Sequence, residues 1–305
     1  MSVAQAPSTA ELVAARLRGG GLDWRSYLLQ GAMLLSLLIA LGVLLVLLAD
    51  IAGRAWPVLT ERPMEFLTSD LSSRPARAGI AQGLVGSLLL ALFVALLALP
   101  IGIGAAVYLE EYAHDTVITR VIRTNIRNLA GVPAIVYGLL GLAVFVTLLG
   151  MGKTLIVGGL TLAILVLPIV VITTSEALRA VPNTIREAAF AVGATRWETV
   201  RSHVLPYAAP GIMTGTILSL ARAFGETAPL LLVGAVAGTF STRGGLFEQL
   251  TGPYSALPTI VFNWAGQPQD EFRSLTAATI VALLAVILLV NGTAILLRNR
   301  YDRKW

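Results

Sequence analysis

Arg222 and Glu226 place two opposite charges inside an otherwise apolar segment, residues 210–237. Residues four apart lie on one face of a helix, so these side chains can pair, and an unpaired arginine at a bilayer centre would cost at least about 2.5 to 3.5 kcal/mol. Arg222 can also offer forked donors to an oxyanion, whereas a glutamate carboxylate accepts a hydrogen bond only from an oxyanion that still carries a proton. The spacing therefore predicts either a structural ion pair or the polar part of a translocation pathway.

The residues beside this pair favour the pathway. Gly225 would let the backbone approach a passing solute, Thr227 adds a hydroxyl, and Pro229 would open the helix there. The predicted pathway residues are Arg222, Gly225, Glu226 and Thr227.

The elements that must hold these residues are membrane helices. The chain is 56% hydrophobic and only 13% charged, whereas soluble domains carry about 25% charged residues. Its mean hydropathy is +0.80. Charge-free windows that approach the bilayer-spanning length of about 20 residues lie in 26–49, 78–109, 128–152, 154–175 and 274–297. Together with 210–237 they predict an all-α integral membrane protein with six transmembrane helices.

The distribution of basic residues predicts the orientation. Most of the 22 lysines and arginines fall in segments that share one side of the membrane with the N-terminus. Because cytoplasmic loops are enriched in such residues, we expect both termini in the cytoplasm. The pI near 9.9 then reflects topology, and we expect no nucleic-acid partner. The predicted parts are a disordered cytoplasmic tail (1–25), a transmembrane domain (26–298) with a cytoplasmic loop (176–209), and a C-terminal tail (299–305).

The longest polar interruption between two apolar runs, residues 184–206, is the second candidate site. It contains two pairs with the spacing of a helix capping box, Thr184 with Glu187 and Thr195 with Glu198. Gly193 between them can take the left-handed conformation that closes a helix. Pro206 would end the second helix and Pro210 would open the next membrane segment. The pattern predicts a helix, turn, helix knob, which could also be an ordinary connector.

The sequence of this knob resembles the EAA loop of ABC-importer permeases. The residues that carry the resemblance are Glu187, Ala188, Ala189, Gly193, Leu205 and Pro206. The family usually has an aliphatic residue where this chain has His203. In that family the loop docks into a groove on the ATP-hydrolysing subunit, so the resemblance implies that these six residues couple the chain to an ATPase.

Other segments narrow the resemblance to one family. The polar opening at 128–138, the span around Pro168, and residues 221–231, 260–265 and 297–301 resemble the A-type permease subunits (PstA) of bacterial phosphate-specific ABC importers. The resemblance covers nearly everything after about residue 75. It implies a multi-pass protein of the bacterial plasma (inner) membrane that moves inorganic phosphate into the cell. It also implies three partners besides the lipid bilayer: a second homologous permease subunit, a dimeric cytoplasmic ATPase subunit and an extracytoplasmic phosphate-binding protein.

We expect no catalytic residue, metal or cofactor in this chain, and ATP would be used by the partner subunit. Residues 152–154 match the end of a phosphate-binding P-loop, but Thr147 stands where that motif needs its first glycine. The chain has no cysteine and only two histidines, far apart in the sequence, whereas metal sites need clustered ligands.

Several alternatives stay open. A secondary transporter usually shows repeated halves and a channel needs rings of like residues or filter loops; neither pattern is evident, and neither class explains the capped knob. Within ABC importers, the alternatives are a permease for another oxyanion, such as sulfate or molybdate, and the partner permease of the phosphate system.

Three peripheral segments complete the expectations. Residues 50–77 read as an irregular interfacial loop, and residues 110–127 as an amphipathic helix at the membrane surface. The aromatic residues of segment 238–273 favour an interfacial belt over a specific docking surface. They are Phe240, Phe247, Tyr254, Phe262, Trp264 and Phe272.

Overall fold

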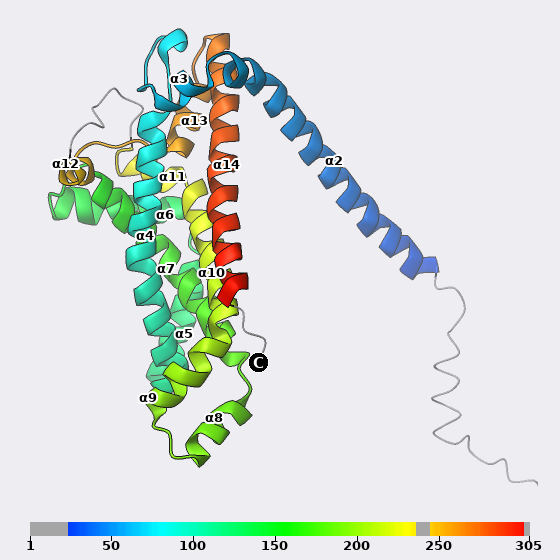
Figure 1. Ribbon diagram of the computed structural model, residues 1–305, viewed down its shortest axis with the longest axis vertical. Coiled ribbons are helices and arrows are strands. Elements are labelled where there is room, and N and C mark those ends of the chain that lie inside the picture. Colours follow the sequence, from blue (N-terminus) through cyan, green and yellow to red (C-terminus); the bar gives the residue numbers. More distant parts are fainter. Residues whose placement is uncertain (1–23, 236–244, 302–305) are drawn as a thin grey trace, which may run out of the picture. The chain divides into compact units, whose positions relative to one another are not determined.

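The computed structural model describes residues 24–235 and 245–301 (Figure 1). The chain forms two compact units, Met1–Asp50 and Ile51–Trp305. The described part of the first unit is the N-terminal length of helix α2 (Trp24–Glu61). The predicted tails at 1–23 and 302–305, the predicted end of the sixth span at 236–237, and Phe240 lie outside the described residues.

The second unit is a bundle of long helices connected by short ones (Figure 1). Its long helices are α4 (Ala81–Val107), α7 (Leu155–Arg179), α10 (Leu205–Gly225) and α14 (Asp270–Tyr301). Its shorter elements are α3 (Pro63–Thr68), η1 (Pro75–Arg77), η2 (Tyr108–Tyr112), α5 (Val117–Ala130), α6 (Ala134–Gly141), η3 (Leu142–Leu148), α8 (Asn183–Ala191), α9 (Arg196–Thr199), η4 (Val200–Val204), α11 (Ala228–Leu232), α12 (Leu246–Thr251) and α13 (Leu257–Ala265). Within the described ranges all regular structure is helical, which confirms the predicted all-α class.

The described helices also confirm a membrane protein. Five of them are long and apolar enough to cross a bilayer, and a bent pair would make a sixth if it counts as one span. That bent pair is α5 with α6 and η3, which meet at 100°. Pro133, between them, is extended (ψ 137°) and cannot continue the helical hydrogen bonds. The predicted span over 128–152, with its polar opening, therefore bends near its start at Pro133.

Helix α7 is the centre of the bundle. Its apolar side chains are buried over most of its length, and it packs against α4, α5, α6 and α10. Small residues allow this close packing: a Cβ at Gly102 of α4 would lie only 2.7 Å from Val170 Cγ1 of α7. Such approach of helices is typical of membrane bundles, where association depends on tight packing.

The two ends of the bundle carry different elements. Helices α3 and α13 lie at one end, and α8 and α9 lie at the other (Figure 1). At the first end, α2 continues to Glu61 and is followed by α3 and η1, so the prediction of an irregular loop over 50–77 is wrong. Helix α3 tolerates Pro63 because this proline stands in its first turn. Backbone N–H groups in the first turn of a helix have no helical hydrogen-bond partner, so the N–H that proline lacks is not needed there.

The aromatic segment at this end is mostly an internal one. Tyr254, Trp264 and Phe272 are buried, and the Trp264 and Phe272 rings pack with centroids 5.7 Å apart. The start of α13 is held against α4, because the Leu257 N–H donates to Ser87 Oγ at 2.8 Å. The interfacial-belt prediction is therefore wrong for these three residues, while Phe247 and Phe262 are exposed.

Candidate functional site

The predicted knob is present at the α8 end of the bundle. Helix α8 ends at Ala191, and Gly193 follows with φ +85°, the left-handed conformation predicted for it. The second capping box is also confirmed. The Glu198 N–H donates to Thr195 Oγ1 at 3.3 Å, and the Thr195 N–H donates to Glu198 Oε2 at 2.8 Å. Gly193 therefore forms the predicted turn after α8, and Thr195 with Glu198 caps the start of α9 as predicted.

The first capping box, Thr184 with Glu187, is wrong. Helix α8 begins two residues earlier than this box would place it, at Asn183, with Pro182 as the N-cap residue and no side-chain cap. The backbone of Pro182 is extended (φ −59°, ψ 137°), and the helix starts directly after it. Thr184 is consequently already inside the first turn, two positions beyond the N-cap.

Pro206 does not end the second helix. The chain is helical from Arg196 to Gly225, and Pro206 stands in the first turn of α10. The preceding turn, η4, is a π-helix, in which the Leu205 N–H bonds to Val200 O five residues earlier. A π-turn changes the hydrogen-bond pattern before the proline, so the helix continues through Pro206 and Pro210.

Most of the six predicted coupling residues lie on the outside of the knob. Glu187, Ala188, Gly193 and Pro206 are exposed, Leu205 is half-buried, and Ala189 is buried against the bundle. The knob also carries exposed apolar side chains that the sequence pattern did not single out: Phe190, Val192 and Trp197. Exposed apolar patches are typical of interaction sites, so these residues make the knob a candidate for one.

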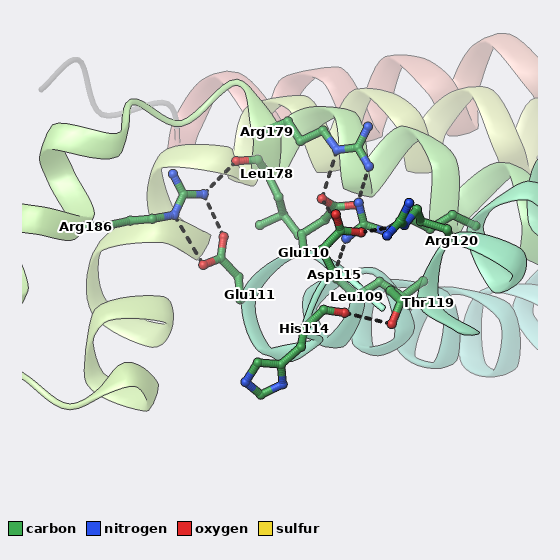
Figure 2. A network of polar contacts seen from close by, with 11 residues as sticks. Leu109, Glu110, Glu111, His114, Asp115, Thr119, Arg120, Leu178, Arg179 and Arg186 are labelled. Atoms are coloured by element: carbon green, nitrogen blue, oxygen red, sulfur yellow. Dashed lines mark hydrogen bonds and ion pairs between the residues drawn. The ribbon is translucent and has the colours of Figure 1, made fainter. Parts of the chain in front are cut away.

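A network of ion pairs holds the knob to the bundle (Figure 2). Glu110 and Glu111 lie in η2, which continues α4. Arg179, at the end of α7, donates through Nε and Nη2 to the two Glu110 oxygens at 2.9 and 2.8 Å. Arg186 of α8 donates through Nε and Nη2 to the two Glu111 oxygens at 3.3 and 2.7 Å. We call these four residues the charge clamp.

Two further cations adjoin the charge clamp. Arg123 of α5 lies 3.6 Å from Glu110 Oε2 and donates to the Leu109 carbonyl. The Arg196 guanidinium lies over the Tyr112 ring, 5.5 Å from its centroid. The expectation that residues 110–127 form one surface helix is wrong, because 110–112 complete α4 and the surface helix α5 begins at Val117. The sequence showed two adjacent carboxylates after an apolar run, but spacing could not identify arginines 69 and 75 residues away.

The predicted pair at the other candidate site also forms. Arg222 Nε lies 3.1 Å from Glu226 Oε1, with the arginine side chain 46% exposed and the glutamate side chain 18% exposed. The predicted span, however, is not one helix: α10 ends at Gly225, and Glu226 is extended (ψ 117°). Helix α11 starts after Thr227, with Pro229 in its first turn, as predicted for this proline. The pair therefore bridges the end of α10 and a break in the helix.

This break gives the site its polar character. Backbone without helical hydrogen bonds is tolerated at membrane depth only where protein buries it or where it lines a water-filled space. Helix α11 is held tightly on the far side of the break, since a Cβ at Gly138 of α6 would lie 2.6 Å from Pro229 Cα. The space beside Gly225 is open among the described atoms. The four predicted pathway residues thus lie together at a fixed interruption between two helices.

The bundle, its broken helix and the knob define a membrane component of a transport system. The sequence model of one family, described as "Binding-protein-dependent transport system inner membrane component", matches residues 98–303, and the chain belongs to this family.

Individual proteins agree with this assignment. The chain is 34% identical over 259 residues to "Phosphate transport system permease protein PstA" of Mycobacterium leprae, an alignment that covers 84% of this chain and 82% of that protein. It is 40% identical over 173 residues to "Probable ABC transporter permease protein YqgI" of Bacillus subtilis, covering 57% of this chain and 59% of that protein, less than two thirds of the relative's length.

A solved structure shows the same fold. A chain of a bacterial ABC transporter involved in the import of the acidic polysaccharide alginate superimposes with a TM-score of 0.62 at 15% identity. The match covers 92% of this chain and 98% of that chain.

Proposed function

We propose that this chain is the transmembrane permease subunit of an ABC importer that moves inorganic phosphate into the cell. The observation that carries the proposal is the similarity to phosphate permeases: relatives with that name are 34 to 35% identical over 70 to 84% of this chain. The permease family and the bundle with its broken helix are consistent with it.

Arg222 and Glu226 give the proposal a chemical basis. The guanidinium carries five N–H donors, and an oxyanion accepts two of them in a fork. Glu226 partly neutralises the arginine, so that an anion is attracted without being trapped. Because its carboxylate has no proton to donate, it favours an oxyanion that supplies one. Phosphate carries such a proton at neutral pH and sulfate does not. Gly225 and Thr227 would complete the polar surface.

The knob would transmit the energy of ATP hydrolysis, which takes place in another subunit. Its exposed residues, among them the apolar side chains of Phe190, Val192 and Trp197, suit a groove on a cytoplasmic ATPase dimer. The α8 end of the bundle and both termini would then lie in the cytoplasm of a bacterium. The transmembrane domain would comprise residues 26–298, with 176–209 as the coupling loop. A second homologous permease and an extracytoplasmic phosphate-binding protein would complete the importer, and this chain would bind no cofactor of its own.

Uptake competition tests the substrate. Cells that lack their own phosphate importer would express the chain with its ATPase, second permease and binding protein, and take up labelled phosphate. We expect uptake that unlabelled phosphate suppresses and that excess sulfate or molybdate leaves unchanged. No importer-dependent uptake of labelled phosphate, together with uptake of labelled sulfate or molybdate by the same cells, would instead favour the permease of another oxyanion.

A further inference from the structure

The charge clamp joins three elements that are far apart in the sequence. Glu110 and Glu111 are neighbours, yet Glu110 pairs with the end of α7 and Glu111 pairs with α8 (Figure 2). Their position in the π-turn η2 allows this divergence at the end of α4. Local π-turns are frequent at functional sites, and here the π-turn also ends the helix, since Ala113 after it is extended.

Arg186 is the residue that connects all three elements. Besides its two bonds to Glu111, it donates through Nη2 to Leu178 O at 3.0 Å and through Nη1 to Val181 O at 2.8 Å. These carbonyls lie at the end of α7 and just beyond it, and Leu178 O also accepts from the Val181 N–H at 3.3 Å. Nη1 also donates to Asn183 Oδ1 at 3.3 Å, at the start of α8 itself. One guanidinium thus holds the ends of α4 and α7 and the beginning of α8.

The clamp is buried enough to resist rearrangement. The Glu110 and Glu111 side chains are only 9% and 8% exposed. A carboxylate at such a position is costly unless its partner remains in place, so separating Glu111 from Arg186, whose side chain is 18% exposed, is strongly unfavourable. Arg179 is 45% exposed, so separating it from Glu110 is less costly. Beneath them Leu178, Val181 and Val204 form part of one buried apolar cluster. A displacement of α8 alone would have to break both the ion pairs and this packing.

We propose that Glu111 and Arg186 are positioning residues that make α8 move as one body with the ends of α4 and α7, while the Glu110 and Arg179 pair locks those two ends to each other. This inference rests on the proposed function, in which α8 docks on the ATPase. A push on α8 would then displace two central helices together. The substitution of one partner would let α8 move without the bundle, so that ATP is consumed while the transported ion does not cross.

The first test measures phosphate uptake and ATP hydrolysis together, in proteoliposomes that hold the complete importer. For Glu111→Gln we expect normal assembly and hydrolysis, but about tenfold less phosphate carried per ATP, because the loss of one buried partner leaves the other charge uncompensated. Arg186→Lys should give a smaller loss, since it keeps the charge but not the fork. The matched control is Asp115→Asn, which removes an ion pair to Arg120 with a side chain 82% exposed, and should leave the ratio unchanged.

A rescue separates a mechanical role from simple stabilisation. The chain has no cysteine, so a Glu111→Cys and Arg186→Cys double variant can be bridged by a short bifunctional thiol reagent. We expect the unbridged variant to hydrolyse ATP with little uptake, and the bridged one to recover uptake per ATP. Normal coupling in both Glu111→Gln and the unbridged double variant would overturn the proposal.

A distance measurement keeps the inference testable even where uptake fails. Spin labels on Tyr108→Cys and Thr184→Cys, both exposed, report the separation of η2 and α8. In the otherwise unaltered complex we expect one narrow distance that ATP does not change, and in the Glu111→Gln background a broad distribution. A distance that shifts with ATP in the unaltered complex would contradict the clamp. A narrow, constant distance in a complex that carries no phosphate would leave the clamp standing and count against the proposed substrate.

Discussion

The Arg222 guanidinium has one donor occupied and others open. Its Nε is paired with Glu226 Oε1 at 3.1 Å, and in the described part of the chain no other hydrogen bond involves this side chain. Clamp residue Arg186, by contrast, uses all three of its nitrogens within the chain. Arg186 therefore has the bonding expected of a structural cation. Arg222 has the bonding expected of a cation whose remaining N–H donors can bind a ligand.

The substitution Arg222→Gln tests whether the open N–H donors of Arg222 bind the transported phosphate. We expect phosphate uptake to fall by about 10- to 100-fold, because hydrogen bonds to charged groups contribute about 1.5 to 3 kcal/mol each. Uptake of labelled phosphate should be measured beside the membrane abundance of the complex. Arg120→Gln, at an exposed arginine of α5, is the control and should change neither. Normal uptake by a well-assembled Arg222→Gln protein would reduce the pair to a structural role.

Glu226→Gln should alter selectivity more than rate. The amide supplies the donor that the carboxylate lacks, so an oxyanion without a proton no longer faces an unpaired negative charge. We expect sulfate to become a better competitor of phosphate uptake, and the ratio of the two inhibition constants is the quantity to measure. An unchanged ratio would show that the carboxylate plays no part in selection.

At the scale of elements, the knob depends on one turn. Gly193 has φ +85° and no atom within 4 Å of the position where its Cβ would lie. A substitution there would meet no neighbour and would strain only the backbone, at about 1 to 2 kcal/mol. The turn sets the direction from α8 to α9, and so the shape that a docking partner would meet.

Gly193→Val should therefore uncouple transport while the chain still inserts in the membrane. We expect normal abundance and a loss of ATP-dependent uptake, measured in the same membranes. Gly193→Asn is the control, because it adds a side chain at the same position while asparagine adopts the left-handed conformation more readily than valine, and it should keep most of the uptake. Full uptake by Gly193→Val would remove the knob from the coupling mechanism.

The elements of the knob also show which local sequence signals are sufficient to predict a helix cap or a turn. Thr195, Glu198 and Gly193 act within a few residues, and the structure has them as predicted. Thr184 has the same local signal but does not cap α8, because the helix starts directly after Pro182, two residues earlier than predicted. The charge clamp could not be predicted from the sequence. Glu110 and Arg179 are 69 residues apart, Glu111 and Arg186 are 75 residues apart, and each pair meets only when α4, α7 and α8 are packed.

At the scale of the molecule, composition predicted the class but not the path of the chain. Long apolar runs are sufficient to identify an all-α membrane protein, and the described helices confirm it. Hydropathy does not register a bend, however, so the window 128–152 did not reveal the 100° turn at Pro133. Of the candidate site, the pairing of Arg222 with Glu226 and an opening of the helix at Pro229 were predicted, whereas the extended backbone at Glu226 was not.

The orientation of the whole bundle gives a further prediction. The α8 end and the α13 end lie at opposite ends of the bundle (Figure 1). With the knob in the cytoplasm, a reporter fused after Trp305 should be cytoplasmic and one inserted near Gly266 should be external, because the basic residues are concentrated on the inner side. Reporter activity that requires each compartment is the measurement. The reverse pattern would place the knob outside, where no ATPase could bind it.

The most direct measurement is phosphate accumulation by proteoliposomes that contain this chain with its second permease, ATPase and binding protein. The inside-to-outside ratio of labelled phosphate is followed with ATP, and with a non-hydrolysable analogue in its place. We expect accumulation above the external concentration with ATP only, and its loss in Arg222→Gln while ATP hydrolysis continues. ATP hydrolysis by the assembled complex without any phosphate accumulation would contradict the account.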